Sequence, residues 1–529
     1  MPPAQVTDRI EEGSRGHGTH NTGLRANWRV LAISLYMGIS LFGYGFDKGA
    51  IAGFQAMPGF LQIFGYETPE GWEIHAGPQQ IISSFMILGS MIGSILCGPL
   101  GGFLGRRHSV MLGSLLMIVS VIIMILTTSM GVLYFSRLLI GIANGLLLNF
   151  TMIYLQECAS AHFRGLCFGI ATLWITTGTT VGMVINHATS EMLSRKAYQI
   201  PLYACFAAPV ILIVTLPFLP ESPRWLLHHQ QEEKALQSLR FFREGACDEI
   251  RIQQEFEEMK AIASRESDSP RDWRLFLEIF KGHNLRRTVI SVGVGTANAG
   301  VGAMFVLAFG TYFFAIAEVA DPFKWIMITN CVGLAGILLT WFVVTWVGRR
   351  LIILFGCVVC TVCMLVMGVV YSVPGVSHDG AGVAIIILVS IYIFGFNFGL
   401  EPYVYLVAGE MPSQQLRAYT MGLANAVSFI FAWLCAFTTP YYINPTELNW
   451  GPKVGYLWFG SGLVVCVFVY LALPEVRGRT LEEIDEMFRN GVPTRDFKTY
   501  ICVEHEEAKA RGVARVLVDK PDSEHVEDI

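Results

Sequence analysis

The stretch Leu104-Gly105-Arg106-Arg107 recurs as Val347-Gly348-Arg349-Arg350, and each copy stands between two long apolar runs. Two further motifs recur at a similar displacement of about 250 residues. Their copies are Glu157/Arg164 with Glu410/Arg417, and Pro220-Glu221-Ser222-Pro223-Arg224 with Pro474-Glu475-Val476-Arg477. A duplicated block of apolar segments with charges at matching places is typical of transporters that alternate between two facings.

Composition places the chain in a membrane. Its 529 residues are 53% hydrophobic and only 15% charged, and the mean hydropathy is +0.50, which is too apolar for a soluble protein of this length. The net charge of −5 gives no support to a nucleic-acid partner. We therefore predict a membrane protein with many spans, and not an enzyme.

Apolar runs near the roughly 20 residues that a helix needs to cross a bilayer recur along the chain. A polar connection over residues 221–285, with helical periodicity in Glu232–Arg243 and Glu249–Arg265, separates six runs from six more. The predicted spans are Val30–Phe54, Gln80–Leu100, Ser109–Leu126, Gly131–Tyr154, Gly165–His187, Leu202–Leu219, Val289–Phe314, Trp325–Val347, Leu351–Tyr371, Ala384–Ala408, Tyr419–Pro440 and Tyr456–Leu473.

Lys and Arg residues indicate which side of the membrane each loop faces, because short cytosolic loops retain them. Of the 37 Lys and Arg residues, only Arg195, Lys196, Lys324 and Lys453 fall in the loops that follow odd-numbered spans. We therefore expect both termini in the cytosol. Residues 1–27 lack an apolar core, so we expect no cleavable signal peptide.

Ionisable residues inside predicted spans are costly and are therefore candidates for function. At a rise of about 1.5 Å per residue, Asp47 and Arg137 both lie in the outer half of the membrane, where they can meet. Such a pair suits proton coupling, since Arg or a proton can neutralise the carboxylate; a static ion pair is the alternative. Lys48, about 100° around the helix from Asp47, is interpreted as a snorkelling or secondary partner. Glu401 suggests a second proton site or an anchor for a polar or cationic substrate.

A second group of charges lies at the predicted cytosolic ends of the spans. Salt bridges among them would hold these ends together in one facing and break in the other. Orientation by positive charge alone would not explain the glutamates that recur in both halves. The candidates for this cytosolic gate are Arg106, Arg107, Glu157, Arg164, Glu221, Arg349, Arg350, Glu410, Arg417 and Glu475.

Three of the 12 cysteines, Cys357, Cys360 and Cys363, have a spacing that resembles a metal site. They lie in a Leu- and Val-rich run without His or carboxylate neighbours, so we interpret them as packing residues. We expect neither a metal nor a cofactor.

Several motifs, taken in order along the chain, resemble those of the sugar porter family of the major facilitator superfamily. The resemblance is greatest to the fungal members of that family. The likeness runs roughly from Trp28 to Phe488. The motifs are Gly45-Phe46-Asp47, Arg137-x3-Gly141, Glu157-x6-Arg164-Gly165, Pro220-Glu221-Ser222-Pro223-Arg224-Trp225-Leu226 and Pro474-Glu475-x2-Gly478-Arg479-Thr480-Leu481-Glu482-Glu483.

The resemblance implies an all-α integral membrane fold in which twelve transmembrane helices form two six-helix bundles around a central cavity, with a small cytosolic helical domain. The predicted boundaries are 1–27 for the N-terminal tail, 28–220 and 286–473 for the bundles, 221–285 for the linker domain and 474–529 for the C-terminal tail. It also implies proton coupling at Asp47 and Arg137, because coupled members tend to have Asp where uniporters have Asn.

The chain departs from the family pattern in places. Gly102 and Thr345 stand where the family usually has Asp beside the Gly-Arg motifs, and Asn298-Ala299 replaces a pair of Gln residues. By their family positions, the substrate-binding candidates are Thr172, Thr179, Asn298, Glu401, Tyr405 and Ser428. For the three hydroxyl residues, packing within their own helices is the alternative.

We predict a plasma-membrane secondary transporter that takes up a sugar (hexose, disaccharide or polyol) with protons by alternating access, as a monomer in the lipid bilayer. One alternative is a facilitative uniporter. The reduced set of amides also leaves open a carrier of an inositol, a quinate-like acid or a secondary metabolite. A transporter-like nutrient sensor is the alternative from another class, although the tail after Pro474 is short for signalling.

Overall fold

The computed structural model describes residues 25–500 and 502, except 55–56, 69–70, 74–75, 161–162, 190–191, 267–273, 308–321, 344–345, 373–377, 414–415, 444–447 and 449. Most of the predicted N-terminal tail, Thr345 and the end of the C-terminal tail therefore lie outside the described residues. The predicted domain boundaries stay predictions.

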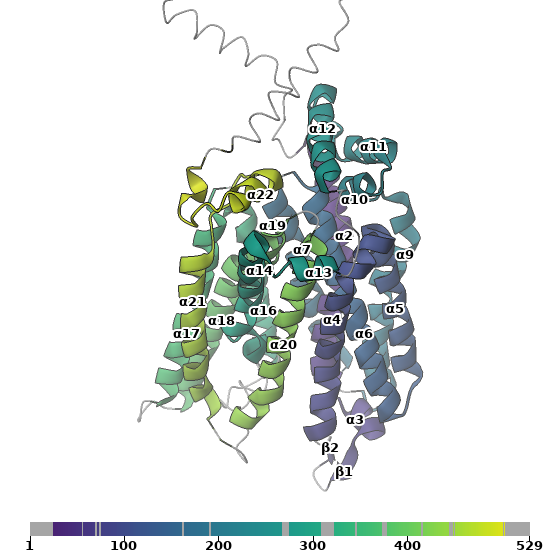
Figure 1. Ribbon diagram of the computed structural model, residues 1–529. Helices are drawn as coiled ribbons and strands as arrows, with labels where there is room; N and C mark the ends of the chain where they lie inside the picture. Colours follow the sequence, from purple (N-terminus) through teal and green to yellow (C-terminus); the bar gives the residue numbers. More distant parts are fainter. Residues whose placement is uncertain are drawn as a thin grey trace, which may run out of the picture.

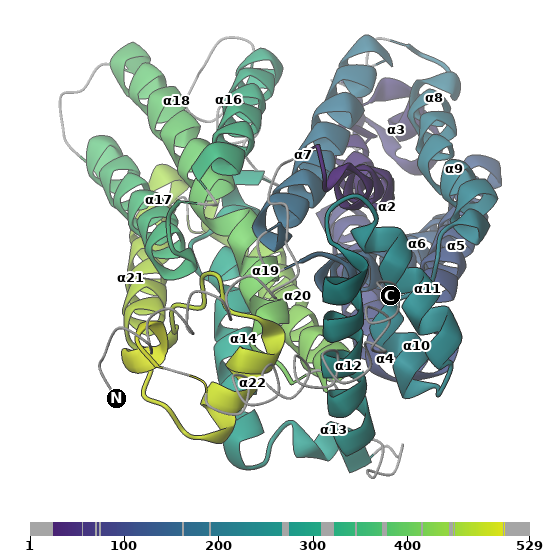
Figure 2. The same cartoon turned by 90° about the horizontal axis from the view of Figure 1, so that it is seen from above.

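The first half of the chain forms one bundle of helices, which lies on the right in Figure 2. Its helices are α2 (Trp28–Phe54), α3 (Pro58–Phe64), α4 (Ala76–Leu104), α5 (Arg106–Leu126), α6 (Met130–Cys158), α7 (Arg164–Thr189), α8 (Lys196–Cys205), α9 (Ala207–Thr215) and the 3₁₀ turn η2 (Leu216–Phe218). The sixth span is thus a run of three short helices and begins at Lys196, ahead of the predicted Leu202.

The second half forms the other bundle. Its elements are α14 (Gly282–Gly300), α16 (Pro322–Val343), α17 (Arg349–Ser372), α18 (His378–Gly395), the π-helical turn η3 (Phe396–Leu400), α19 (Glu401–Glu410), α20 (Arg417–Ile443), the 3₁₀ turn η4 (Gly451–Val454) and α21 (Gly455–Ala472). In this half, α18, η3 and α19 together occupy the place of the tenth predicted span.

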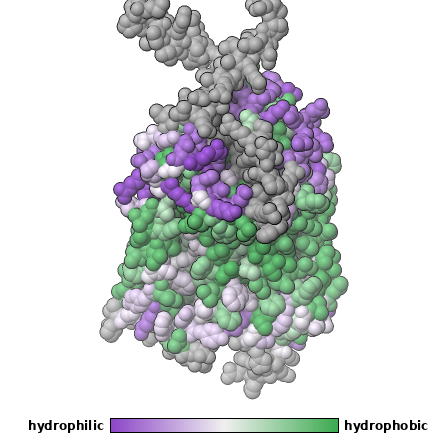
Figure 3. Space-filling view, viewed as in Figure 1, coloured by the Kyte–Doolittle hydropathy of each residue, from purple (hydrophilic) through white to green (hydrophobic). Residues whose placement is uncertain are grey.

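Ten of the described helical stretches are long and apolar enough to cross a membrane, and α16 holds a shorter apolar stretch, Lys324–Thr340. The remaining predicted span begins in α14 and runs into residues outside the described part. Large apolar side chains such as Phe103, Phe218 and Trp346 are mostly exposed on the bundles. Figure 3 shows a broad apolar belt across the visible face of the bundles, and a belt of this kind is the surface that lipid tails cover. The molecule is a helical membrane protein with two bundles of six spans.

Short helices cover one end of the bundles (Figure 1). They are α10 (Pro223–His228), α11 (Glu232–Arg243), α12 (Glu249–Glu266), α13 (Arg274–Glu278), α22 (Leu481–Arg489) and η5 (Asp496–Lys498). The two helices predicted in the polar connection are confirmed by α11 and α12. We call this end of the molecule the capped end.

A short hairpin at the opposite end was not predicted. Strands β1 (Tyr66–Thr68) and β2 (Gly71–Glu73) pair antiparallel, with Glu67 opposite Trp72. The hairpin lies between the first two spans (Figure 1), and we call this end of the molecule the hairpin end.

Glycines allow the closest helix contacts, both within a bundle and between the two. A Cβ atom on Gly45 of α2 would lie only 1.9 Å from the carbonyl oxygen of Ile175 in α7. Between the bundles, a Cβ atom on Gly422 of α20 would lie 2.5 Å from the carbonyl oxygen of Ser94 in α4. Such small-residue contacts let membrane helices approach each other, because lipid offers no hydrophobic drive for association.

The motif around Thr480 starts α22 with a capping box. The Thr480 hydroxyl accepts a hydrogen bond from the Glu483 N–H (3.2 Å), and the Glu483 carboxylate accepts one from the Thr480 N–H (2.8 Å). We expect Thr480→Ala to cost about 0.5–2 kcal/mol, since it removes one acceptor from the helix start. The measurement is the thermal unfolding midpoint of the purified protein in detergent. Thr480→Ser should retain the wild-type midpoint, and equal midpoints for the Ala and Ser variants would contradict the prediction.

Candidate functional site

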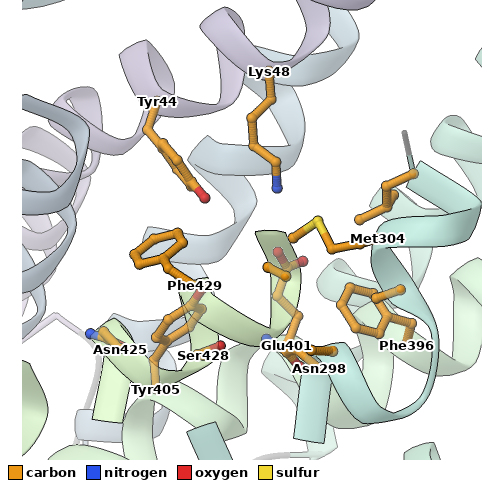
Figure 4. A pocket seen from close by; sticks show the side chains of 14 residues that line it. Tyr44, Lys48, Asn298, Met304, Phe396, Glu401, Tyr405, Asn425, Ser428 and Phe429 are labelled. Carbon is orange, nitrogen blue, oxygen red and sulfur yellow. The ribbon is translucent and has the colours of Figure 1, made fainter. Parts of the chain in front are cut away.

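A pocket lies between the two bundles (Figure 4) and contains about 490 Å³ of empty space, part of it open to solvent. One bundle contributes α2, and the other contributes α14, the residues 303–307 that follow it, η3, α19 and α20. Its lining residues are Tyr44, Lys48, Asn298, Ala299, Ala303, Met304, Leu307, Phe396, Glu401, Tyr405, Asn425, Ser428, Phe429 and Ala432. Apolar walls with a few polar groups are the usual composition of a small-molecule site.

Four of the six substrate-binding candidates line this pocket: Asn298, Glu401, Tyr405 and Ser428. The Oδ1 atom of Asn298 is buried and has no hydrogen-bond partner among the described residues. A buried amide oxygen without a partner is costly. It is therefore well placed to accept a hydrogen bond from a bound solute.

The backbone around Glu401 is irregular in a way that serves the pocket. The π-helical turn η3 ends at Leu400, and Pro402, which has no N–H, occupies the first turn of α19. π-helical turns insert one extra residue into a helix and often mark functional sites. Glu401 and Tyr405 lie one turn apart on α19, so both side chains reach the pocket.

The other two candidates, Thr172 and Thr179 on α7, do not line the pocket. The hydroxyl of Thr172 is fully buried and donates to the carbonyl oxygens of Phe168 and Gly169, both at 3.1 Å. The hydroxyl of Thr179 donates to the carbonyl oxygen of Gly45 in α2 at 3.0 Å. Placing these two residues in the site was wrong for this pocket, because their hydroxyls are satisfied by backbone groups.

The sequence reasoning missed Lys48 and Tyr44 as lining residues. Lys48 does not snorkel towards the membrane surface: its ammonium points into the pocket (Figure 4) and lies 5.3 Å from the centre of the Tyr44 ring. The helical rotation of about 100° per residue shows only that Lys48 faces another direction than Asp47, and it does not show what lies in that direction.

Asp47 of α2 and Arg137 of α6 form the predicted contact. The Arg137 Nη1 atom donates to Asp47 Oδ1 at 2.7 Å, and both residues are buried. Asn144 donates to the second carboxylate oxygen at 3.3 Å. Because the pair lies within one bundle and away from the pocket lining, any effect on the solute must pass through α2.

At the capped end of the first bundle, Glu157 and Glu221 accept hydrogen bonds from the neighbouring gate candidates. Arg106 donates to Glu157 at 2.8 Å, and the Ser222 hydroxyl donates to the other oxygen of Glu157 at 2.5 Å. The backbone N–H groups of Arg106 and Arg107 donate to Glu221 at 3.1 Å. Burial raises the pKa of Glu221, although the N–H of Ser222 and the charge of Arg106 act in the opposite direction.

The second half repeats this arrangement with its own residues. The N–H groups of Arg349 and Arg350 donate to Glu475 at 3.0 Å and 3.2 Å, and the Arg349 guanidinium lies 3.7 Å from Glu410. Glu475 thus caps the start of α17 as Glu221 caps the start of α5. The recurring motifs therefore hold equivalent helix ends in each bundle.

Two of the gate candidates connect the bundles to each other. Arg164 of α7 lies 4.0 Å from Glu410 of α19 in the other bundle. Arg417 of α20 interacts electrostatically with Glu157 of α6, again across the bundle boundary. Each bundle therefore has one arginine that is attracted to a glutamate of the other bundle at the capped end.

Deeper in the membrane, a short polar chain also joins the bundles. Asn425 of α20, which lines the pocket, donates to Asn149 of α6 at 2.7 Å, and Asn149 donates to the Ser94 hydroxyl of α4 at 2.9 Å. The sequence reasoning did not select these residues, since single amides in apolar runs carry no pattern.

Comparison with known proteins agrees with this architecture. The family model described as "Sugar (and other) transporter" matches residues 32–488. The chain is 28% identical to a major facilitator-type transporter, ecdD, of Aspergillus rugulosus over 92% of this chain and 91% of that protein. It is also 28% identical to a general alpha-glucoside permease of Saccharomyces cerevisiae over 88% of this chain and 76% of that protein.

Among solved structures, the proton:xylose symporter XylE bound to 6-bromo-6-deoxy-D-glucose has a TM-score of 0.75, with 18% identity over 87% of this chain and 99% of that one. An inward open conformation of the xylose transporter XylE from E. coli has a TM-score of 0.64 at 18% identity, over 86% of this chain and 99% of that one. At this identity the likeness concerns the fold alone.

Proposed function

Because the chain belongs to the sugar (and other) transporter family, we propose that it imports a sugar or polyol together with protons, by alternating access of the pocket between its two bundles. The observation that carries this proposal is a pocket between the two bundles that contains an unpaired amide oxygen, that of Asn298, while an ion pair between Arg164 and Glu410 joins the bundles at the capped end. Its relatives' names include glucose, hexose and α-glucoside transporters.

The capped end is assigned to the cytosol of a plasma-membrane protein. The polar connection and the basic motifs lie at that end, and short cytosolic loops retain Lys and Arg. An ion pair between Arg164 and Glu410, and the electrostatic attraction between Arg417 and Glu157, join the bundles at this end, and we therefore assign this arrangement to the outward-facing side of the cycle.

The pocket chemistry suits a polyhydroxylated ring. Asn298, Asn425 and Ser428 offer donors and acceptors for hydroxyl groups, and the rings of Tyr405 and Phe429 offer flat apolar surfaces for C–H faces. Both kinds of contact are needed, because a pyranose is polar around its rim and apolar on its faces.

Proton coupling is supported by the buried Asp47–Arg137 pair. The Asp47 carboxyl group can be ionised and paired with Arg137, or it can be protonated and neutral, so it has two charge states inside the membrane. Since α2 carries Asp47 on one side and pocket residues on the other, a change in this pair can move the pocket wall.

The test of the whole proposal is uptake of a labelled panel of monosaccharides, disaccharides and polyols in transport-deficient cells. We expect uptake of at least one neutral solute, and we expect a protonophore to abolish its accumulation. Uptake that the protonophore leaves unchanged would favour a uniporter, and no uptake of any solute in the panel would contradict the proposal.

Replacing Asn298 or Tyr405 by Ala should raise the half-saturation concentration for uptake roughly 5- to 150-fold, because the solute loses a hydrogen-bond partner at Asn298 or an aromatic surface at Tyr405. The measurement is initial uptake rate against solute concentration, normalised to surface expression. Thr172→Val is the matched control, since the Thr172 hydroxyl bonds only its own helix. Wild-type half-saturation in both Ala variants would show that the solute binds elsewhere.

A further inference from the structure

Two opposite charges face each other across the pocket. The ammonium of Lys48 and the carboxyl of Glu401 both point into it (Figure 4), and they interact electrostatically. They form no ion pair with each other, although both belong to the described residues. A neutral sugar needs neither charge, and separated charges inside a membrane protein are costly.

Among the described residues, Lys48 forms no ion pair outside the pocket that would neutralise its charge. The neighbouring Asp47 is held by Arg137 and Asn144 on another side of α2. The Tyr44 ring contributes a cation–π contact, which does not neutralise the charge. Among the described residues, the countercharge that faces Lys48 is therefore Glu401, which α19 presents from the other bundle. The other titratable groups that face Glu401 are the phenols of Tyr44 and Tyr405.

The charge balance of the pocket indicates which solute it accepts. With Lys48 charged and Glu401 ionised, the pocket is neutral. A bound cation would meet the ammonium of Lys48, whereas an anion can replace Glu401 as its counter-ion. If one proton enters with the anion and neutralises Glu401, the pocket stays neutral.

From this arrangement we propose that the solute is a polyhydroxylated acid, whose carboxylate binds Lys48 while Glu401 is protonated. This inference rests on the proposed function, because it uses the same pocket and the same alternating access. The amides of Asn298 and Asn425 and the hydroxyl of Ser428 bind the hydroxyl groups, and Lys48 selects the carboxylate. The preferred substrate is therefore a sugar acid or a cyclic hydroxy acid.

The first experiment compares matched pairs of labelled solutes in cells that express the full chain. Each pair shares a hydroxylated ring and differs in one carboxylate: D-glucose with D-glucuronate, and myo-inositol with D-quinate. We expect a half-saturation concentration at least about 10-fold lower for an acid than for its neutral partner. Uptake of the neutral partners alone would overturn this inference and leave the proposed function intact. Uptake of none of the four would overturn both.

The second experiment assigns the preference to Lys48. We expect Lys48→Met to weaken binding of the preferred acid by about 10- to 150-fold, because a charged hydrogen bond is lost, and to change the neutral partner little. Lys48→Arg keeps the charge and should restore most of the preference, which also shows that the position tolerates substitution. The matched control is Lys453→Met, which removes an exposed lysine outside the pocket. An unchanged acid preference in Lys48→Met would overturn the assignment.

The third experiment concerns the proton on Glu401. Glu401→Gln is permanently neutral, so it should bind the acid without a proton. Its half-saturation concentration for the acid should therefore lose the pH dependence of the wild type, whereas that for the neutral partner should follow the wild type. The same pH dependence for the acid in Glu401→Gln and wild type would overturn the role of Glu401.

Discussion

Replacing Asp47 by Asn is expected to abolish accumulation of solute against its gradient, while exchange of solute across the membrane continues. The amide has nearly the shape of the carboxylate but cannot take up a proton, and it leaves Arg137 without its 2.7 Å ion pair. Asp47 is not one of the residues that line the pocket, so the substitution removes no side chain from the pocket lining. The measurement is the steady-state ratio of internal to external solute in energised cells, together with counterflow of labelled solute into preloaded vesicles.

The control for this substitution is Asp496→Asn, which makes the same chemical change at an exposed residue of η5. It should accumulate solute as the wild type does. If Asp47→Asn concentrates solute to the wild-type level, the pair with Arg137 is structural, as a static buried ion pair would be. Loss of both accumulation and counterflow at normal surface expression would equally contradict a role limited to coupling.

The Asp47–Arg137 contact could be predicted because it depends on depth alone. The helical rise fixes how far each residue lies from its end of the span, and both residues fall at a similar depth. The direction of a side chain around its helix is another matter. It depends on which helices surround α2, and a single sequence does not contain that information. For this reason Lys48 was misinterpreted, although it lies beside a correctly placed residue.

The same distinction explains which substrate-binding candidates line the pocket. Asn298, Glu401 and Tyr405 lie on helices of the second half that border the pocket. Thr172 and Thr179 lie on α7, where their hydroxyls find backbone acceptors before they reach the cavity. Amides and carboxylates cannot be satisfied as easily within one helix, and this makes them better predictors of a cavity than hydroxyl residues are.

The repeat also predicted the charged motifs at the capped end, but not their pairing. The spacing placed these charges at the ends of the spans, but it did not say which arginine meets which glutamate. In the structure Arg164 faces Glu410 of the other bundle, and Arg417 faces Glu157. A duplicated sequence cannot distinguish a contact within a copy from the equivalent contact between copies, because both have the same residues.

We call the two contacts between the bundles, Arg164 with Glu410 and Arg417 with Glu157, the exchanged pairs. If they hold the capped end closed, the accessibility of that end reports which side of the membrane the pocket faces. Replacing Arg417 by Ala removes the charge that α20 brings to Glu157, while Arg106 still compensates that carboxylate from its own bundle. We therefore expect the closed state of the capped end to lose about 1–3 kcal/mol, which raises the open population roughly 5- to 150-fold. Arg164→Ala should act in the same direction through Glu410.

Cys97 provides a native reporter for this change. It is fully buried in α4, in the contact between the bundles. A Cβ atom added to Gly422 of α20 would lie only 3.5 Å from the Cβ atom of Cys97. A membrane-impermeant thiol reagent, applied to the capped end in inside-out vesicles, should label Cys97 faster in Arg417→Ala in proportion to the open population. The same labelling in a Cys97→Ala background identifies the signal that belongs to other cysteines.

Two further variants separate a gate from a general loosening of the fold. Arg489→Ala breaks an ion pair with Asp485 inside α22 at the same end of the molecule, so it should label as the wild type does. Arg417→Lys keeps the charge but not the guanidinium geometry and should give an intermediate rate. Wild-type labelling of Cys97 in both Arg417→Ala and Arg164→Ala would mean that the exchanged pairs do not hold the capped end closed. Equal acceleration in Arg489→Ala would mean that any lost charge at this end loosens the bundles, and only a response confined to the exchanged pairs makes them the gate.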